Sequence, residues 1–250
     1  MTMIEFGLLV LAGIGAGLCG SVVGLASLVS YPALLAAGLG PVAANVTNTV
    51  ALVGTGAGSA LGSRQELQGQ GPRLVRLVPM AMLGGALGAA LLLLTPAGVF
   101  ARVVPWLVGL ASVLVIVRPR PRFLQALHHG GDSRGLVAGV FLVAIYGGYF
   151  GAAAGVLILA LLLAASDASL PQSNAVKNVV LATANVVAAG GFVLLGPVVW
   201  SAAVPLGVGC VIGGRLGPSV VRRAPGDLLR VLIGVAGVTL AVKLGLDSYR

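Results

Sequence analysis

Charged residues are scarce in this sequence, and acidic ones are the scarcest. Of 250 residues, 8% are charged, and Asp and Glu together number six against 15 Lys and Arg. A soluble domain carries about 25% charged residues, so a water-soluble fold of this length is excluded. The acidic residues lie at the ends of apolar runs or between them, which argues against a carboxylate proton relay inside a membrane.

Cysteine and histidine are almost absent too, with two residues of each. Cys19 and Cys210 lie in apolar segments, where we expect them to serve as small packing residues rather than metal ligands. His128 and His129 lie in a basic loop and are assigned no role. The sequence has no Walker motif, no paired carboxylates and no nucleophile–base arrangement. Neither an enzyme nor a bound cofactor is therefore expected.

Long apolar segments are abundant in the sequence. Hydrophobic residues make up 58% of the chain, and the mean hydropathy is +1.07. Apolar runs of roughly 20 residues recur, and each is long enough to span a hydrocarbon core. The net charge of +9 is spread over short loops between these runs, as in cytoplasmic anchoring, so nucleic acid is not an expected partner. The sequence predicts an all-α polytopic protein of the cytoplasmic (cell inner) membrane.

Two halves of the chain carry the same landmarks in the same order. A polar motif covers 45–50 and again 175–180, and a glycine motif covers 84–88 and again 213–217. This alignment pairs Asn48 with Asn178 and Thr47 with Lys177. Chance similarity between apolar helices rarely keeps polar and glycine landmarks in register, so we predict two structural repeats.

The repeats are expected to cover 1–117 and 135–250, joined by a basic cytoplasmic linker over 118–134. Each repeat divides into about five helical segments, of which the first two are short and interrupted by glycine, as in a broken helix or a hairpin. The expected segments are roughly 6–18, 22–39, 44–61, 74–94 and 99–117, then 135–149, 152–165, 174–195, 198–216 and 228–246.

Basic loops indicate the orientation of these segments. Arginines place three connections in the cytoplasm: the loop with Arg64, Arg73 and Arg76, the central linker, and the loop with Arg222 and Arg223. If each half crosses the membrane an odd number of times, the segment after Ala44 runs inward and its equivalent after Asn174 runs outward. The sequence thus favours inverted repeats, because parallel halves would put the Arg222 loop outside.

Transporters with inverted repeats bind substrate near the midplane, between discontinuous helices. Lys177 is the one charged residue in an otherwise apolar, polar-dotted segment. A buried ammonium in a bilayer usually marks a pathway or a site, so Lys177 could be the electrostatic partner of an anion. The alternative is a lysine near a helix start that extends to the membrane interface.

Other polar residues at the equivalent places complete the predicted site. Five asparagines could donate hydrogen bonds to substrate oxygens or could hold helices together: Asn45, Asn48, Asn174, Asn178 and Asn185. Helix starts near Ala44 and Asn174 would aim free N–H groups at an anion. Two tyrosines beside Gly147-Gly148 could face a polar cavity or belong to an interfacial belt. The predicted substrate-binding residues are Lys177, Asn48, Asn178, Asn45, Asn174, Thr47, Tyr146 and Tyr149.

Two stretches also carry a family resemblance. They are Ala16–Leu35, followed by Ala43-Ala44-Asn45 and Thr47, and Tyr146–Gly155, followed by Asn174–Asn178. In these stretches, and over nearly its whole length, the chain resembles the sulfite exporter TauE/SafE family of membrane transporters. The resemblance implies a multi-pass transporter of sulfur-containing anions such as sulfite or organosulfonates. The chain departs from the pattern after Gly24, where Leu25–Leu28 replaces a run of glycines common in the family.

We therefore predict a secondary membrane transporter for a small anion, sulfur-containing according to the resemblance, that works by alternating access at the repeat interface. An anion channel or a non-transporting membrane scaffold is the alternative, and dependence of the flux on an ion gradient separates the two. The expected partners are the anion and the lipid bilayer. A proton or sodium ion for coupling and a second copy of the chain are left open.

Overall fold

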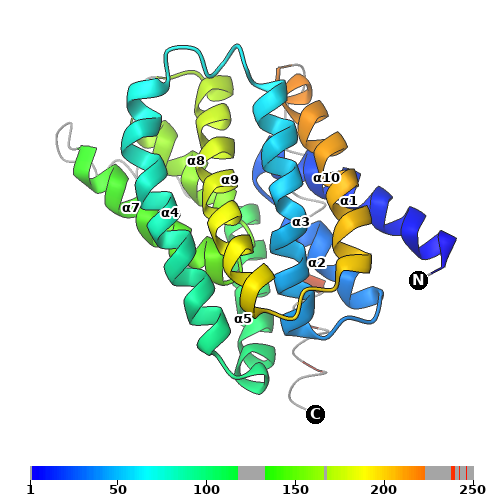
Figure 1. Ribbon diagram of the computed structural model, residues 1–250. Helices are drawn as coiled ribbons and strands as arrows, with labels where there is room; N and C mark the ends of the chain where they lie inside the picture. The colour runs from blue at the N-terminus through cyan, green and yellow to red at the C-terminus, as the bar shows by residue number, and fades with distance from the viewer. Residues whose placement is uncertain are drawn as a thin grey trace.

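The computed structural model shows a bundle of helices packed side by side (Figure 1). The structure describes residues 2–117, 133–165, 168–222 and the positions 238, 239, 242 and 246. Within these ranges the elements are helical: α1 (Met3–Val23), α2 (Ser27–Ala36), α3 (Pro41–Gly62), α4 (Gly71–Leu94), α5 (Ala97–Val117), α7 (Ser133–Tyr149), α8 (Ala154–Ala164), α9 (Leu170–Leu195) and α10 (Trp200–Val221). The predicted linker up to 132 and nearly all of the last predicted segment lie outside the described residues.

Four of these helices are long and apolar enough to cross a membrane, namely α1, α4, α9 and α10. This confirms the predicted all-helical polytopic membrane protein. Helix α3 has 22 residues but does not reach the same hydropathy, because asparagine, threonine and glycine recur along it. Twelve of its residues are nevertheless buried, so its polar groups face protein rather than lipid.

A glycine with left-handed backbone follows each of α1 and α7: Gly24 (φ +82°) directly after Val23, and Gly151 (φ +74°) two residues after Tyr149. A short helix follows each of them, α2 or α8, which confirms the predicted broken helices. The predicted first segment, 6–18, was too short, since α1 continues to Val23. Its internal glycines do not interrupt it, and two of them, Gly13 and Gly17, pack against the backbone of α10.

The most extensive helix contacts join helices of different halves. Helix α1 packs along α10, and α4 packs along α7, while α3 contacts α10 and α4 contacts α9. Helices α3 and α9 contact each other at the centre. In Figure 1, α3 and α10 run upward, whereas α4 and α9 run downward. Equivalent helices of the two halves therefore run in opposite directions, as inverted repeats require, and the inverted repeat itself stays a prediction that these directions support.

The ends of the bundle agree with the distribution of basic residues. A guanidinium nitrogen of Arg222, at the end of α10, lies 2.7 Å from a carboxylate oxygen of Glu66 in the α3–α4 loop. The two basic segments are thus on the same side, as expected for two cytoplasmic connections. The α9–α10 connection, which lacks basic residues, lies at the opposite end (Figure 1).

Matched glycine motifs make matched contacts. An added Cβ at Gly84 or Gly88 would meet the backbone of α7, and one at Gly213 would meet the backbone of α1. The next glycine in each motif faces a central helix: Gly85 meets Ala184 of α9, and Gly214 meets Thr55 of α3. Small residues let membrane helices approach to backbone contact, so these glycines explain how both half-to-half seams close.

Gly88→Ala is expected to destabilise the protein by about 1–3 kcal/mol, the usual cost of overpacking. Its Cβ would overlap the Ile145 carbonyl oxygen and lie 2.7 Å from the Tyr149 nitrogen. The matched control is Gly190→Ala on α9, which is exposed and meets no atom within 4 Å. The control should be neutral or stabilising by up to ~1 kcal/mol through helix propensity. Thermal unfolding in detergent measures both, and equal melting temperatures would contradict the predicted tight seam.

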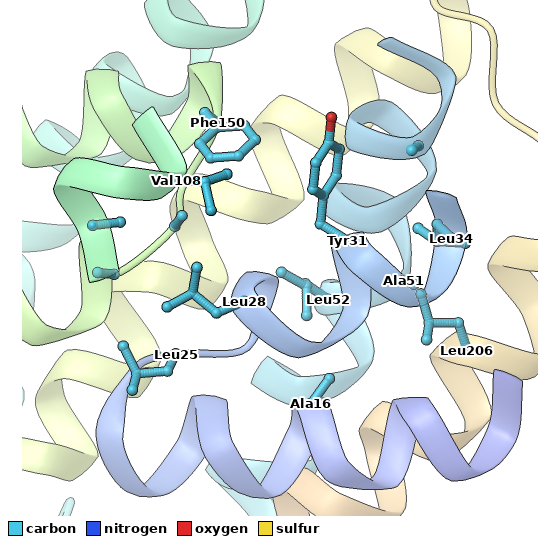
Figure 2. Packing of buried hydrophobic residues seen from close by; sticks show 14 of the residues in the cluster. Ala16, Leu25, Leu28, Tyr31, Leu34, Ala51, Leu52, Val108, Phe150 and Leu206 are labelled. Atoms are coloured by element: carbon cyan, nitrogen blue, oxygen red, sulfur yellow. The ribbon is translucent and has the colours of Figure 1, made fainter. Parts of the chain in front are cut away.

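Buried apolar side chains form a large cluster around the first break (Figure 2). Leu25 and Leu28 flank the turn between α1 and α2, and Tyr31 stands beside Phe150 from the second break. A second cluster joins α4, α7, α8 and α9. Both clusters combine residues of the two halves, and Leu25 and Phe150, one from each break, belong to the first cluster.

Candidate functional site

A cavity of about 50 Å³ lies between the central helices α3 and α9, where the two breaks face them. It is lined by Gly20, Gly24, Ala26, Ser27, Thr49, Leu52, Thr55, Gly56, Ser59, Gly147, Phe150, Gly151, Ala154, Gly155, Asn178, Leu181, Ala182 and Asn185. A water molecule needs roughly 10–15 Å³ of such space. The cavity thus has room for a few waters or one small solute.

The two breaks touch at this cavity. A Cβ added to Gly24 would lie 2.5 Å from the Cα of Gly155, and one added to Gly155 would overlap the Cα of Gly24. Gly24 also needs its left-handed backbone, which only glycine adopts without strain. Two segments separated by about half of the chain therefore approach to backbone contact because neither carries a side chain there.

Neutral polar groups supply the chemistry of the cavity wall. Among the described lining residues, hydroxyls come from Ser27, Thr49, Thr55 and Ser59, amides come from Asn178 and Asn185, and none is charged. A hydroxyl or an amide can donate to an oxyanion or accept from a donor. Within the described part of the chain, no three His, Cys, Asp or Glu residues gather as metal ligands, so the wall fits a small polar solute.

Lys177 lies directly behind this wall. Its side chain is fully buried (0% exposed), which rules out the alternative that it extends to the membrane interface. Its Nζ donates to the carbonyl oxygens of Gly20 (3.1 Å) and Ser21 (3.3 Å) in the last turn of α1. A cation at a helix C-terminus is favourable because the end carbonyls carry partial negative charge. Gly20 itself lines the cavity, so the ammonium contacts a residue of the cavity wall.

Two asparagines on the same face of α9 hold the same turn of α1. Asn174 and Asn178 each donate through Nδ2 to the Ser21 carbonyl oxygen, at 2.8 and 3.3 Å. With Lys177 they occupy positions i, i+3 and i+4 of one helix, which lie on one face. Among the described residues no backbone N–H reaches the Ser21 carbonyl where α1 breaks, and side chains from the other half of the chain satisfy it. The Gly20 carbonyl accepts from the Gly24 N–H (2.9 Å) and takes the Lys177 ammonium as a second donor.

A side chain of the first half likewise binds the end of the broken helix α7 in the second half. Asn45 on α3 donates through Nδ2 to the Tyr149 carbonyl oxygen at the end of α7 (2.9 Å). Asn48 instead holds the break of its own half, since its Nδ2 donates to Ser27 Oγ (3.1 Å) and its Oδ1 accepts from Ser30 Oγ. Each broken helix end is thus held by an asparagine from the other half.

The remaining predicted residues make local contacts. Thr47 Oγ1 accepts from the Val199 N–H (3.0 Å) in the α9–α10 connection. The Tyr146 hydroxyl donates to the Ala152 carbonyl oxygen (2.7 Å) inside the second break. The Tyr149 ring packs edge-on against Phe100, with centroids 5.8 Å apart. None of these three side chains lines the cavity.

The prediction of free N–H groups at two helix starts is wrong. Helix α9 begins at Leu170, capped by the hydroxyl of Ser169, so Asn174 is more than one turn inside it. Helix α3 begins at Pro41, and the Ala44 N–H already bonds the Gly40 carbonyl oxygen (2.8 Å). The apolar pattern placed both starts late, because Pro and capping residues start a helix ahead of its apolar face.

Of the eight predicted substrate-binding residues, Asn178 lines the cavity, and Lys177 and Asn174 bind the turn of α1 that borders it. Asn185, considered for its amide alone, is in the wall. The hydroxyls of Thr55 and Ser59 were not foreseen. Their signal was present, since they continue the helical spacing of the polar face that starts at Asn45 and Asn48.

Aromatic side chains close one side of the cavity. Phe150 lines it, and the ring of Phe150 lies edge-on to Tyr31 (5.3 Å between centroids) and to Phe100 (6.2 Å). Figure 2 shows Tyr31 and Phe150 facing each other above Leu28 and Leu52. These rings come from α2, α5 and the second break, so the wall on this side is built from both halves.

Comparisons with known proteins agree with this architecture. A family model described as "Sulfite exporter TauE/SafE" matches residues 9–244. The chain is 27% identical to the probable membrane transporter protein YfcA of Escherichia coli (strain K12), over 97% of this chain and 90% of that protein. It is 24% identical to the probable membrane transporter protein ORF9 of Sinorhizobium sp, over 93% and 89%. A probable membrane transporter protein of Haemophilus influenzae is 22% identical over 94% and 92%. No solved structure matches the chain.

Proposed function

Because this chain belongs to the sulfite exporter TauE/SafE family and is a membrane transporter, we propose that it is a secondary transporter of a small anion, of the size and chemistry of sulfite or a small organosulfonate. The observation that carries the proposal is the cavity between α3 and α9 at both helix breaks. Transporters built from inverted repeats bind substrate at this place, between discontinuous helices at the repeat interface.

Charge and hydrogen bonding support an anion as the substrate. Lys177 is the one charged side chain among the fully buried residues of the described chain, and it borders the cavity through Gly20. In a low-dielectric interior its positive charge acts over several ångströms. Hydroxyl and amide donors in the wall can bond oxyanion oxygens without adding charge. The wall thus suits a small oxyanion better than a cation or an apolar solute.

Alternating access is the mechanism that we propose. The two seams, α1 with α10 and α4 with α7, join the halves on either side of the central pair. Rocking of one repeat against the other around a fixed central site is how such folds expose the site to each side in turn. Opposite directions of α3 and α9 support the inverted arrangement that this requires (Figure 1). The basic connections support a cytoplasmic location for the Arg222 side of the bundle.

Thermal stabilisation of the purified protein by small anions tests the substrate class. A specific ligand raises the melting temperature by mass action, so sulfite or a small sulfonate should raise it more than chloride at equal ionic strength.

Flux in proteoliposomes then tests the mechanism. Accumulation of the anion against its gradient, driven by an imposed ion gradient, is expected of a secondary transporter, whereas a channel only equilibrates it.

Asn185→Leu is expected to abolish the anion-induced rise in melting temperature while the protein stays folded. The substitution replaces an amide of the cavity wall with an apolar side chain that cannot donate a hydrogen bond. Val186→Leu is the matched control, because the adjacent Val186 is 51% exposed and does not line the cavity. Retention of the full anion effect in Asn185→Leu would place the substrate elsewhere.

A further inference from the structure

The ends of the two broken helices are alike in backbone and unlike in charge. Counting back from the left-handed glycines, Gly20 of α1 corresponds to Gly147 of α7. In α1, the carbonyls of Gly20 and its neighbour Ser21 receive the ammonium of Lys177. The repeat alignment pairs Lys177 with Thr47, which has no charge. Among the described residues, no charged side chain bonds a carbonyl at the end of α7, unlike the end of α1.

Acceptor oxygens remain without donors at the end of α7. The N–H groups of Phe150 and Gly151 both return to the Tyr146 carbonyl oxygen, at 2.9 and 3.0 Å. Among the hydrogen bonds of the described residues, none reaches the carbonyl of Gly147 or Gly148. Carbonyls at a helix C-terminus carry partial negative charge, and here they border the cavity through Gly147 and Gly151.

A side-chain oxygen at the same place is also unpaired. Asn45 is fully buried (0% exposed), and the Tyr149 carbonyl fixes its Nδ2 as the donor. Its Oδ1 has no hydrogen-bond partner in the described structure. The hydroxyl of Tyr31, 1% exposed and packed on Phe150 of the same break, has none either. A buried acceptor without a donor is costly, so this orphan oxygen points to a missing partner.

We propose that the end of α7 is a sodium site, formed by the Asn45 Oδ1 and the carbonyl oxygens of Gly147 and Gly148 in the last turn of α7. Carbonyls of unwound segments and half-helix C-terminal ends are the groups that hold Na⁺ in broken-helix transporters. The ion takes at α7 the place that the Lys177 ammonium takes at α1. A positive charge then lies at both breaks, on the two sides of the cavity.

The sodium site does not depend on which anion is transported, so it can be tested without the transported substrate. Melting temperatures are measured on the purified full-length protein in NaCl and in choline chloride at equal ionic strength. Sodium should raise the melting temperature of the wild type by roughly 3–5 °C near saturation. Equal melting temperatures in the two salts would overturn the site, as expected if a water molecule satisfies the Asn45 oxygen.

Two substitutions at Asn45 and one control locate the effect. Asn45→Ala removes the side-chain oxygen and should abolish the sodium shift. Asn45→Asp keeps an oxygen and adds a charge that needs the cation, so the shift should increase. Thr183→Ala, which removes an intrahelical hydrogen bond of α9 outside the cavity wall, should retain the wild-type shift. A sodium shift that survives in Asn45→Ala, or that fails to increase in Asn45→Asp, refutes the proposal.

Discussion

Lys177→Gln is expected to reduce anion flux in proteoliposomes by roughly 10- to 100-fold, the equivalent of ~1.5–3 kcal/mol for a charge-assisted interaction. Glutamine keeps an N–H donor for the Gly20 and Ser21 carbonyls, so hydrogen bonding between α9 and the end of α1 should survive in part. What is lost is the positive charge beside the cavity. Initial rates at matched protein density, with the melting temperature measured in parallel, separate transport from folding.

A second variant at the same position divides the two roles of the lysine. Lys177→Met removes both the charge and the hydrogen bonds to α1 while filling a similar volume. It should lose flux like Lys177→Gln and should also change the melting temperature, because the carbonyls at the end of α1 lose a donor. If Lys177→Gln transports at the wild-type rate, the charge plays no part in transport and Lys177 serves only to bind the end of α1.

Gly24→Ala is expected to be the most damaging small substitution in the described chain. The left-handed backbone costs an alanine about 1–2 kcal/mol, and the added Cβ would lie 2.5 Å from the Cα of Gly155. Overpacking against a backbone adds about 1–3 kcal/mol. We expect a fall in melting temperature of at least ~5 °C and loss of transport, because the two breaks are forced apart at the cavity.

Gly38→Ala is the control that separates these two costs. Gly38 has a similar backbone angle (φ +87°) but no atom within 4 Å of an added Cβ. It should therefore show the backbone cost alone and should retain transport. Equal effects of Gly24→Ala and Gly38→Ala would mean that the contact between the breaks contributes nothing beyond backbone strain.

Features that depend on local backbone geometry could be predicted from the sequence, whereas contacts between distant residues could not. The broken helices could be foreseen, since Gly24 and Gly151 act through their own backbone angles. The position of Lys177 relative to its helix start was misjudged, because Ser169 and Pro171 start α9 before the apolar pattern does. Its partners, Gly20 and Ser21, lie more than 150 residues away along the chain, and no local pattern could identify them.

Sequence alone was enough to predict a helical membrane protein with two related halves. Few charges, long apolar runs and a repeated order of polar and glycine motifs are properties of composition and spacing, so they need no contacts to be read. Which helices meet could be learned from the three-dimensional arrangement alone. Gly24 touches Gly155, and Asn45 holds the end of α7, because close helix packing brings side-chain-free surfaces together across the two halves. The cavity exists at that meeting point, and its wall combines residues that are distant in sequence.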